Sequence, residues 1–262
     1  MSNTTPGKSI IQRHGAVALI MSLGLLVAVC HAAPTTQESQ QVTSTSIASE
    51  TLSTRQQAIV PIAAFAAKGD LARLNDALNQ GLDAGLTVTD VREVLVQLYA
   101  YAGFPRSLNA LGELMKVLET RRQRGVQDAP GHAPSRPIPT GAALLSAGTA
   151  NQTKLAGGAV KGPVFDFAPA IDEYLKTHLF GDIFERDNLD WQSREIATVA
   201  MLAAMPGVEP QLQAHMRISM NVGLTESQLR QLGQVLADRV DADSATRAHD
   251  ALDKQVAAKS VR

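Results

Sequence analysis

The chain has 262 residues and a mass of 27.8 kDa, which is long enough for one large domain or two small ones. Its formal net charge of −1 and its lack of a basic cluster exclude the electrostatic pattern of a nucleic-acid-binding protein. Hydrophobic residues make up 45% of the chain but aromatic residues only 4%, and alanine and leucine carry most of the apolar content. That balance favours helices over sheets, so we expect an all-α fold.

The start of the chain has the pattern of an export signal. Lys8 and Arg13 form a basic start, and the apolar run that follows over 15–29 is too short to span a bilayer comfortably. We therefore predict a signal peptide over 1–33, a periplasmic location and no stable insertion into a membrane. A retained anchor and lipidation at Cys30 are the alternatives. Cleavage removes Cys30, the only cysteine of the chain.

After the signal, the composition changes from polar to helical. Residues 34–52 are rich in Thr, Ser and Gln and predict a flexible mature N-terminus. A helical pattern begins at 53–69, where Ser53 and Gln56 have the spacing of a capping box. Pro61 interrupts that pattern, and we expect it to kink the helix or to mark its true start.

Further helical segments complete a first repeat over 53–125. The apolar periodicity predicts three of them, at 70–86, 87–103 and 104–125. Thr87 and Asp90 have capping spacing at the start of the second. Residues 126–163 hold many of the prolines and glycines and lack helical periodicity, so they predict a linker or a long wrapping segment.

A second group of helices follows. The pattern predicts helices at 165–184, 190–205, 210–223 and 225–240. Asp190 is the expected N-cap of one of them, and Thr225 with Gln228 forms another capping box. These helices define a second repeat over 164–240, and the charged residues 241–262 are expected to form a C-terminal tail ending in a loose helix.

The two halves repeat one another. Residues 78–98 and 216–236 share the frame G-L-T-x-x-x-[VL]-R-x-[VL], and RQQAIVPIAAFAA upstream of the first matches REIATVAMLAAM upstream of the second. Two copies of one helical unit explain this match better than two unrelated domains. Each copy has an apolar face that the other copy, or another chain, has to cover.

The repeated segments resemble the carboxymuconolactone decarboxylase family, which includes the alkyl hydroperoxidase D-like proteins. The residues that carry the resemblance are YLKTHLFGDIFERDNLDWQSREIATVAMLAAM (174–205), HMRISMNVGLT (215–225) and YAYAGFPRSLNAL (99–111). The resemblance implies an all-α fold of two alkyl hydroperoxidase D-like helical repeats packed as a bundle. It also implies a homo-oligomer, with a trimer as the expected form.

The two copies depart from the family pattern in complementary ways. The first keeps the Tyr-Ala-Gly-x-Pro element but has Ala77 where the second has His215, and the second lacks that element. One interpretation is a degenerate first copy with a purely structural role. The other is a composite site, in which His215 faces Tyr101 and Arg106 of the first copy.

The presence or absence of cysteine decides which of the two branches of the family this chain can resemble in its chemistry. The hydroperoxidase branch uses a Cys-x-x-Cys pair, because its redox step needs a thiolate and a resolving thiol, and neither repeat contains a cysteine. The decarboxylase branch needs no thiol, metal or organic cofactor. We therefore predict a carboxy-lyase-type enzyme without cofactor or metal, acting on a small carboxylated or lactone compound. A non-catalytic oligomeric binding module on the same fold is the alternative.

Five residues are assigned to that site. His215 is the acid/base candidate, and Glu195, at the position of the acidic residue of the hydroperoxidase branch, is expected to orient it. Arg106 is expected to hold a carboxylate, and Tyr101 and Trp191 are assigned to substrate binding. The structural alternatives are a core histidine, a glutamate that complements its helix N-terminus, and an arginine that caps the preceding helix or pairs on the surface.

The acidic segment before the second apolar helix offers one more interpretation. His178, Asp182 and Asp187 are possible metal ligands, but they are scattered around a turn without a ligand periodicity. We expect no metal there, and a lid or packing arm with turn and cap residues instead.

Overall fold

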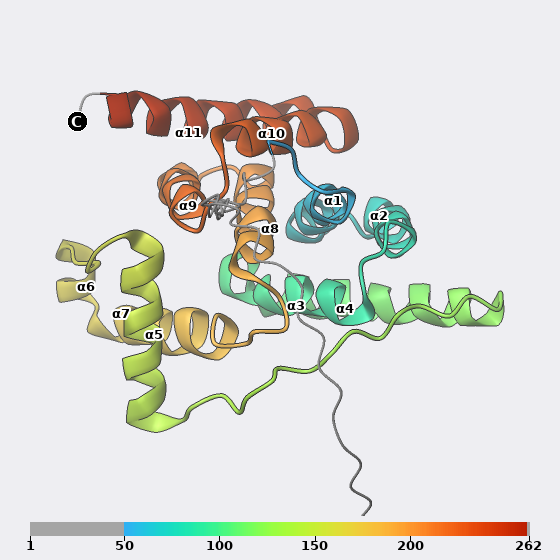
Figure 1. Ribbon diagram of the computed structural model, residues 1–262, viewed down its shortest axis with the longest axis horizontal. Coiled ribbons are helices and arrows are strands. Elements are labelled where there is room, and N and C mark those ends of the chain that lie inside the picture. The colour runs from blue at the N-terminus through green and yellow to red at the C-terminus, as the bar shows by residue number, and fades with distance from the viewer. Residues whose placement is uncertain (1–49, 261–262) are drawn as a thin grey trace, which may run out of the picture. The chain divides into compact units, whose positions relative to one another are not determined.

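The computed structural model describes residues 50–260, and within that range every regular element is a helix, as expected (Figure 1). The predicted signal peptide over 1–33 lies outside the described residues. Among the described helices, none is long and apolar enough to cross a bilayer. In chain order the elements are α1 (Thr54–Lys68), α2 (Leu71–Asp83), α3 (Val88–Gln97), α4 (Tyr99–Gln123), α5 (Gly141–Ala156), α6 (Pro163–Phe167), α7 (Pro169–Tyr174), the π-helix η1 (Leu175–Ile183), α8 (Trp191–Ala204), α9 (Glu209–Asn221), α10 (Glu226–Arg239) and α11 (Ala242–Ser260).

The helix starts follow the capping residues of the sequence. Ser53, Thr87 and Thr225 each form a complete capping box with the residue three positions later, and the Asp190 side chain accepts from the backbone N–H of Ser193. Each cap satisfies backbone donors that have no partner inside the helix, which stabilises the helix by roughly 1 kcal/mol. The predicted N-termini of α1, α3, α8 and α10 are therefore confirmed.

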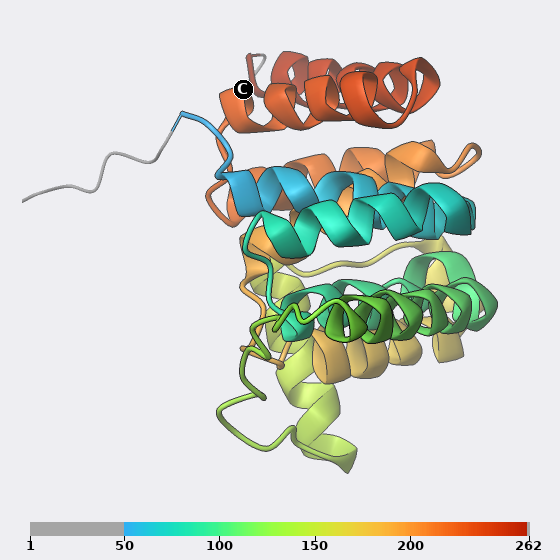
Figure 2. The ribbon, with the colours of Figure 1, turned by 90° about the vertical axis from the view of Figure 1, so that its right-hand side faces the viewer.

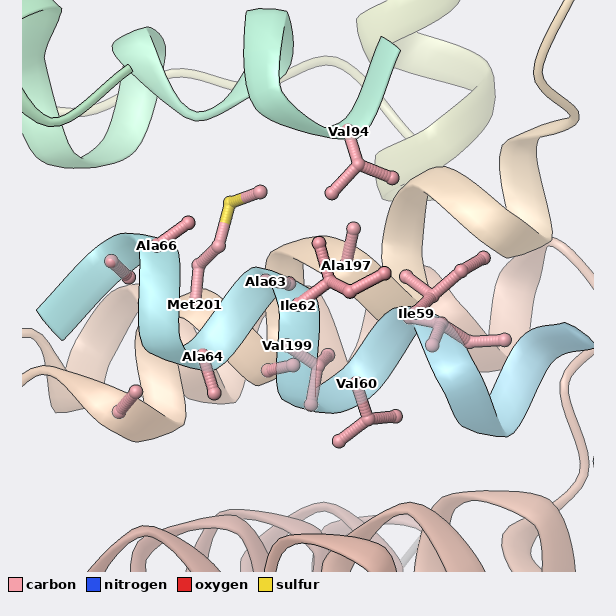
Figure 3. Packing of buried hydrophobic residues seen from close by; sticks show 14 of the residues in the cluster. Ile59, Val60, Ile62, Ala63, Ala64, Ala66, Val94, Ala197, Val199 and Met201 are labelled. Atoms are coloured by element: carbon pink, nitrogen blue, oxygen red, sulfur yellow. The ribbon is translucent and has the colours of Figure 1, made fainter. Parts of the chain in front are cut away.

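The core is formed where the two repeats meet. α1 of the first repeat packs along α8 of the second, and Figure 3 shows Ile62 and Ala63 of α1 in one cluster with Ala197 and Met201 of α8. Small alanine side chains let the two helix axes approach, and each fully buried isoleucine contributes about 1.5–3 kcal/mol. In Figure 2, α10 and α11 lie on one side of the α1 and α2 layer, and α3 and α4 lie on the other.

This central position explains why Pro61 does not end α1. The helix is continuous from Thr54 to Lys68 with Pro61 inside it, so the expectation that Pro61 marks the start was wrong. A proline in a helix interior costs about 3 kcal/mol, because it removes a backbone hydrogen bond and crowds the preceding turn. Residues 58–67 of α1 are all buried, and this burial offsets the cost.

The predicted boundary at residue 103 appears as a break in the backbone. Gly103 has φ 81° and ψ 161°, which separates Tyr99–Ala102 from the helical residues that follow it. Only glycine takes that conformation without strain. The expected helices at 87–103 and 104–125 therefore meet at this residue.

Three segments differ from their predictions. Residues 34–49 of the predicted flexible segment 34–52 lie outside the described residues, but Leu52 at its end is only 3% exposed, and its backbone N–H donates to Gln231 Oε1 at 2.6 Å. The predicted helix at 165–184 is interrupted at Ala168, because a residue that precedes proline avoids the helical conformation. The described part of the predicted tail over 241–262 is not loose: α11 packs on α10, and Leu252 is fully buried.

Residues 126–163 also differ, since they contain the helix α5, which packs across η1. Small residues make up most of this helix, and its three leucines, at 144, 145 and 155, do not form a regular apolar stripe. The crossing relies on Gly148, where an added Cβ would lie 1.7 Å from the backbone oxygen of Lys176. A close backbone approach at Gly148 therefore attaches this helix together with Leu155, which is fully buried in a cluster with Leu179 and Phe180 of η1.

Replacing Gly148 by alanine is expected to destabilise the protein, although alanine favours helix formation. The clash with the Lys176 carbonyl forces the two helices apart, and overpacking of this kind costs about 1–3 kcal/mol. Gly112→Ala in α4 is the matched control, because an added Cβ there meets nothing within 4 Å. Urea unfolding followed by circular dichroism should show a loss for the first variant and no loss for the second. Equal stability of both would contradict the close crossing.

Candidate active site

His215 and Glu195 form a buried pair between α9 and α8. These helices lie side by side (Figure 1), and His215 Nδ1 is 2.8 Å from Glu195 Oε2. His215 is 7% exposed and Glu195 is 0% exposed. Because a carboxylate oxygen only accepts, this contact assigns the proton to Nδ1 and leaves Nε2 as the nitrogen that can exchange a proton with a ligand.

Tyr101 of the first repeat lies against this pair. Its ring meets the His215 ring edge-on, with centroids 5.5 Å apart and an interplanar angle of 80°. The break at Gly103, two residues later, turns the chain away again. The structure thus brings one residue of the first repeat to the histidine of the second, which is the arrangement of a composite site.

Unpaired polar atoms gather around His215. Within residues 50–260, the Tyr101 hydroxyl, Glu195 Oε1 and Ser219 Oγ are enclosed and have no well-formed hydrogen bond. Ser219 lies four residues after His215 and so shares its face of α9. His215 Nε2 has no partner among the described residues either, yet it is not one of the sealed atoms. Unpaired buried polar groups are costly, and a cluster of them is typical of a site that receives a polar ligand.

The Tyr101 phenol is held in its neutral form. Burial raises the pKa of Tyr101 well above its usual value, and the nearby charge of Glu195 raises it further. The Thr198 hydroxyl and the charge of Arg194 act in the opposite direction but do not reverse the shift. Tyr101 therefore offers an O–H donor beside His215.

A buried ionic network supports the start of α8. Glu93 of α3 is 1% exposed and accepts from Arg186 at 2.8 and 2.7 Å, from Arg194 at 3.1 Å and from Asn188 at 3.0 Å. Burial alone raises the pKa of Glu93, but the hydrogen bonds from Arg186 and Asn188 and the charge of Arg194 bring it down to about 2.

The same network reaches the next turn of α8. Gln97 Nε2 donates to the Arg194 carbonyl at 3.0 Å and to Thr198 Oγ1 at 2.7 Å. Arg194 directly precedes Glu195 and Thr198 follows it by three residues, so contacts from the first repeat hold α8 on both sides of the residue that pairs with His215.

Arg106 does not take the predicted position. It is exposed, and its guanidinium lies against Gly69, where an added Cβ would be 2.2 Å from Nη1. Gly69 is the C-cap of α1, and a cation there complements the negative end of the helix. The structure thus places Arg106 on the surface at the end of α1, which is not the helix that directly precedes it.

Trp191 lies one turn before Glu195, as the first residue of α8. Its indole N–H donates to the Phe184 carbonyl at 3.1 Å, and Lys154 Nζ lies 4.9 Å from the centre of its ring. It lines a pocket of about 470 Å³ together with Lys154, Asp190, Gln192, Asn221 and Val222.

The three residues considered as metal ligands are not brought together. His178 Nδ1 lies 3.1 Å from Asp182 Oδ2 on the surface of η1. Asp187 instead accepts from the Ser135 backbone N–H at 2.8 Å. Among residues 50–260, no cluster of three or more His, Cys, Asp or Glu side chains has a metal-binding arrangement.

Sequence reasoning missed the residues that frame the site. Glu93 and Arg194 are charged residues within apolar helix patterns, which is a detectable signal of a buried ion pair, but their partners are distant in sequence. Lys154 gave no signal, because it lies in a segment without periodicity.

Both repeats match the sequence model of a known protein family. The sequence model of the carboxymuconolactone decarboxylase family matches residues 38–115 and 169–254, which together make up more than half of the chain. The second match extends into α11, and α5 lies between the two matches. No curated protein sequence matches the chain. The chain belongs to the carboxymuconolactone decarboxylase family, as a member with two tandem repeats.

Proposed function

We propose that the protein is a carboxy-lyase-type enzyme that catalyses cofactor-free decarboxylation, or a related proton transfer, on a small carboxylated or lactone compound. The observation that carries this proposal is the buried His215–Glu195 pair, with Nε2 left open and unpaired polar atoms around it. Following the predicted signal over 1–33, we place this activity in the periplasm.

The side chains suit the charge changes of such a reaction. When the bond to the carboxylate carbon breaks, its electron pair moves into an adjacent carbonyl and CO₂ leaves, so that an enolate forms. The neutral Tyr101 hydroxyl and the Ser219 hydroxyl are donors for the enolate oxygen. An imidazolium at His215, stabilised by Glu195, then delivers the Nε2 proton to the carbanion carbon and regains a proton from water.

A decarboxylation assay in D₂O tests this proposal. The mature protein is incubated with a panel of carboxylated γ-lactones and β-keto acids, and CO₂ release is followed together with deuterium incorporation by NMR. The expected result is stoichiometric CO₂ release with deuterium at the carbon that carried the carboxylate. Exchange of deuterium alone would support the proton-transfer form. Neither CO₂ release nor exchange above the buffer rate would overturn the enzymatic proposal.

An exposed apolar stripe on α4 favours the second candidate, an oligomeric binding module without catalysis. Phe104, Leu108 and Met115 are 63%, 62% and 72% exposed, and their spacing of four and seven residues puts them on one helix face. Exposed apolar patches mark interaction surfaces. Ligand binding by the wild-type protein with no turnover in the D₂O assay would favour this candidate.

A further inference from the structure

The helix α5 is an insertion that forms one wall of a pocket. It lies between the two family-matched ranges and ends beside α9, where Leu155 is fully buried and its carbonyl accepts from Asn221 Nδ2 at 2.9 Å. This contact places Lys154 among the residues that line the 470 Å³ pocket, together with Trp191 and Val222.

Most polar groups of this pocket already have partners within the protein. Gln192 Nε2 donates to the Val222 carbonyl at 3.1 Å. The Asp190 carboxylate accepts from the Ser193 backbone N–H and from its hydroxyl, both at 2.8 Å. These bonds hold Gln192 and Asp190 in the wall, and Lys154 is the one cation among the residues that line the pocket.

Lys154 is held over the pocket without a counter-ion. Its Nζ lies 4.9 Å from the centre of the Trp191 ring, and no carboxylate of the described chain comes within ion-pair distance of it. The hydrogen bond from Trp191 to the Phe184 carbonyl fixes the ring, so the cation has a defined resting position. A cation beside an apolar surface is the pairing that an organic anion requires.

We propose that this pocket binds a small organic carboxylate, with its anionic group on Lys154 and its apolar body against Trp191 and Val222. The same two helices carry the pocket and the catalytic pair, since Trp191 is four residues before Glu195 on α8 and Val222 directly follows the last residue of α9, which carries His215. The inference deepens the proposed function by naming the class of ligand and the cation that recognises it. Lys154 thus takes the role that Arg106 does not fill.

Trp191 is the only tryptophan of the chain, so its fluorescence reports directly on this pocket. The probe is cyclohexanecarboxylate, which does not absorb in the tryptophan range, and cyclohexanecarboxamide is its neutral counterpart. We expect a saturable fluorescence change with the carboxylate and binding at least about tenfold weaker with the amide, because the charge-assisted contact is lost. Lys154→Met should weaken carboxylate binding about tenfold, whereas Lys161→Met, at an exposed lysine of the same connecting segment, should leave it unchanged.

Equal binding of the carboxylate to the wild-type protein and to Lys154→Met would overturn the proposal, as would the lack of any saturable change. Circular dichroism checks that both exposed substitutions leave the fold intact. His215→Gln should bind the probe as the wild-type protein does. Probe binding therefore tests the carboxylate site, and the D₂O assay tests the enzymatic proposal. Lys154-dependent binding with neither CO₂ release nor deuterium exchange from any compound would retain this site and reject the enzymatic proposal.

Discussion

Replacing His215 by glutamine is expected to lower kcat for decarboxylation or proton exchange by about 10²–10⁴-fold, with little change in KM. Glutamine can still hydrogen-bond to Glu195, so the site stays filled, but it cannot transfer a proton. Because the imidazole meets Tyr101 only edge-on and leaves Nε2 open, its loss removes a reactive group rather than a packing element. Steady-state kinetics in the CO₂ assay measure the effect.

The matched control is His178→Gln, which changes an exposed histidine on η1 that is also hydrogen-bonded to a carboxylate. This variant should keep its activity. If His215→Gln were equally active while its thermal unfolding matched that of the wild-type protein, His215 would be a structural histidine, and the acid/base role would be wrong.

Replacing Glu93 by glutamine is expected to destabilise the protein by about 3–5 kcal/mol, because it leaves two arginines without the charge that compensates them. Arg194 is fully buried, and burial lowers its pKa, which shows how strongly that site disfavours an unpaired cation. Urea unfolding at pH 7 measures the loss. Glu119→Gln is the control, since Glu119 pairs with Arg122 on the surface and its removal should have no measurable effect.

Glu93 also makes the free energy of unfolding depend on pH. The folded-state pKa of Glu93 is about 2, below its ordinary value of 4.5, so its stabilisation is complete above pH 4.5 and is lost as the pH falls toward 2. The shift corresponds to roughly 3 kcal/mol. The difference in unfolding free energy between the wild-type protein and Glu93→Gln should therefore shrink from pH 7 to pH 3. A constant difference would mean that Glu93 acts through packing alone.

Local signals in the sequence determined the helix starts, the break at Gly103, the tandem repeat and the lack of a cysteine for thiol chemistry. Capping residues act within one turn, and a missing residue type needs no structure to detect. The pairing of His215 with Glu195 also followed from the sequence, because both residues lie in one repeat at positions that the family resemblance identifies.

Only the tertiary structure decided which residues of the first repeat meet that pair. Tyr101 reaches His215, whereas Arg106, five residues later, lies at the end of α1 because the chain turns at Gly103. The attachment of α5 depends on a backbone crossing at Gly148, which no side-chain pattern reveals. Contacts between distant helices arise from the packing of whole faces, and so the position of Lys154 beside Trp191 became visible only when those faces were assembled.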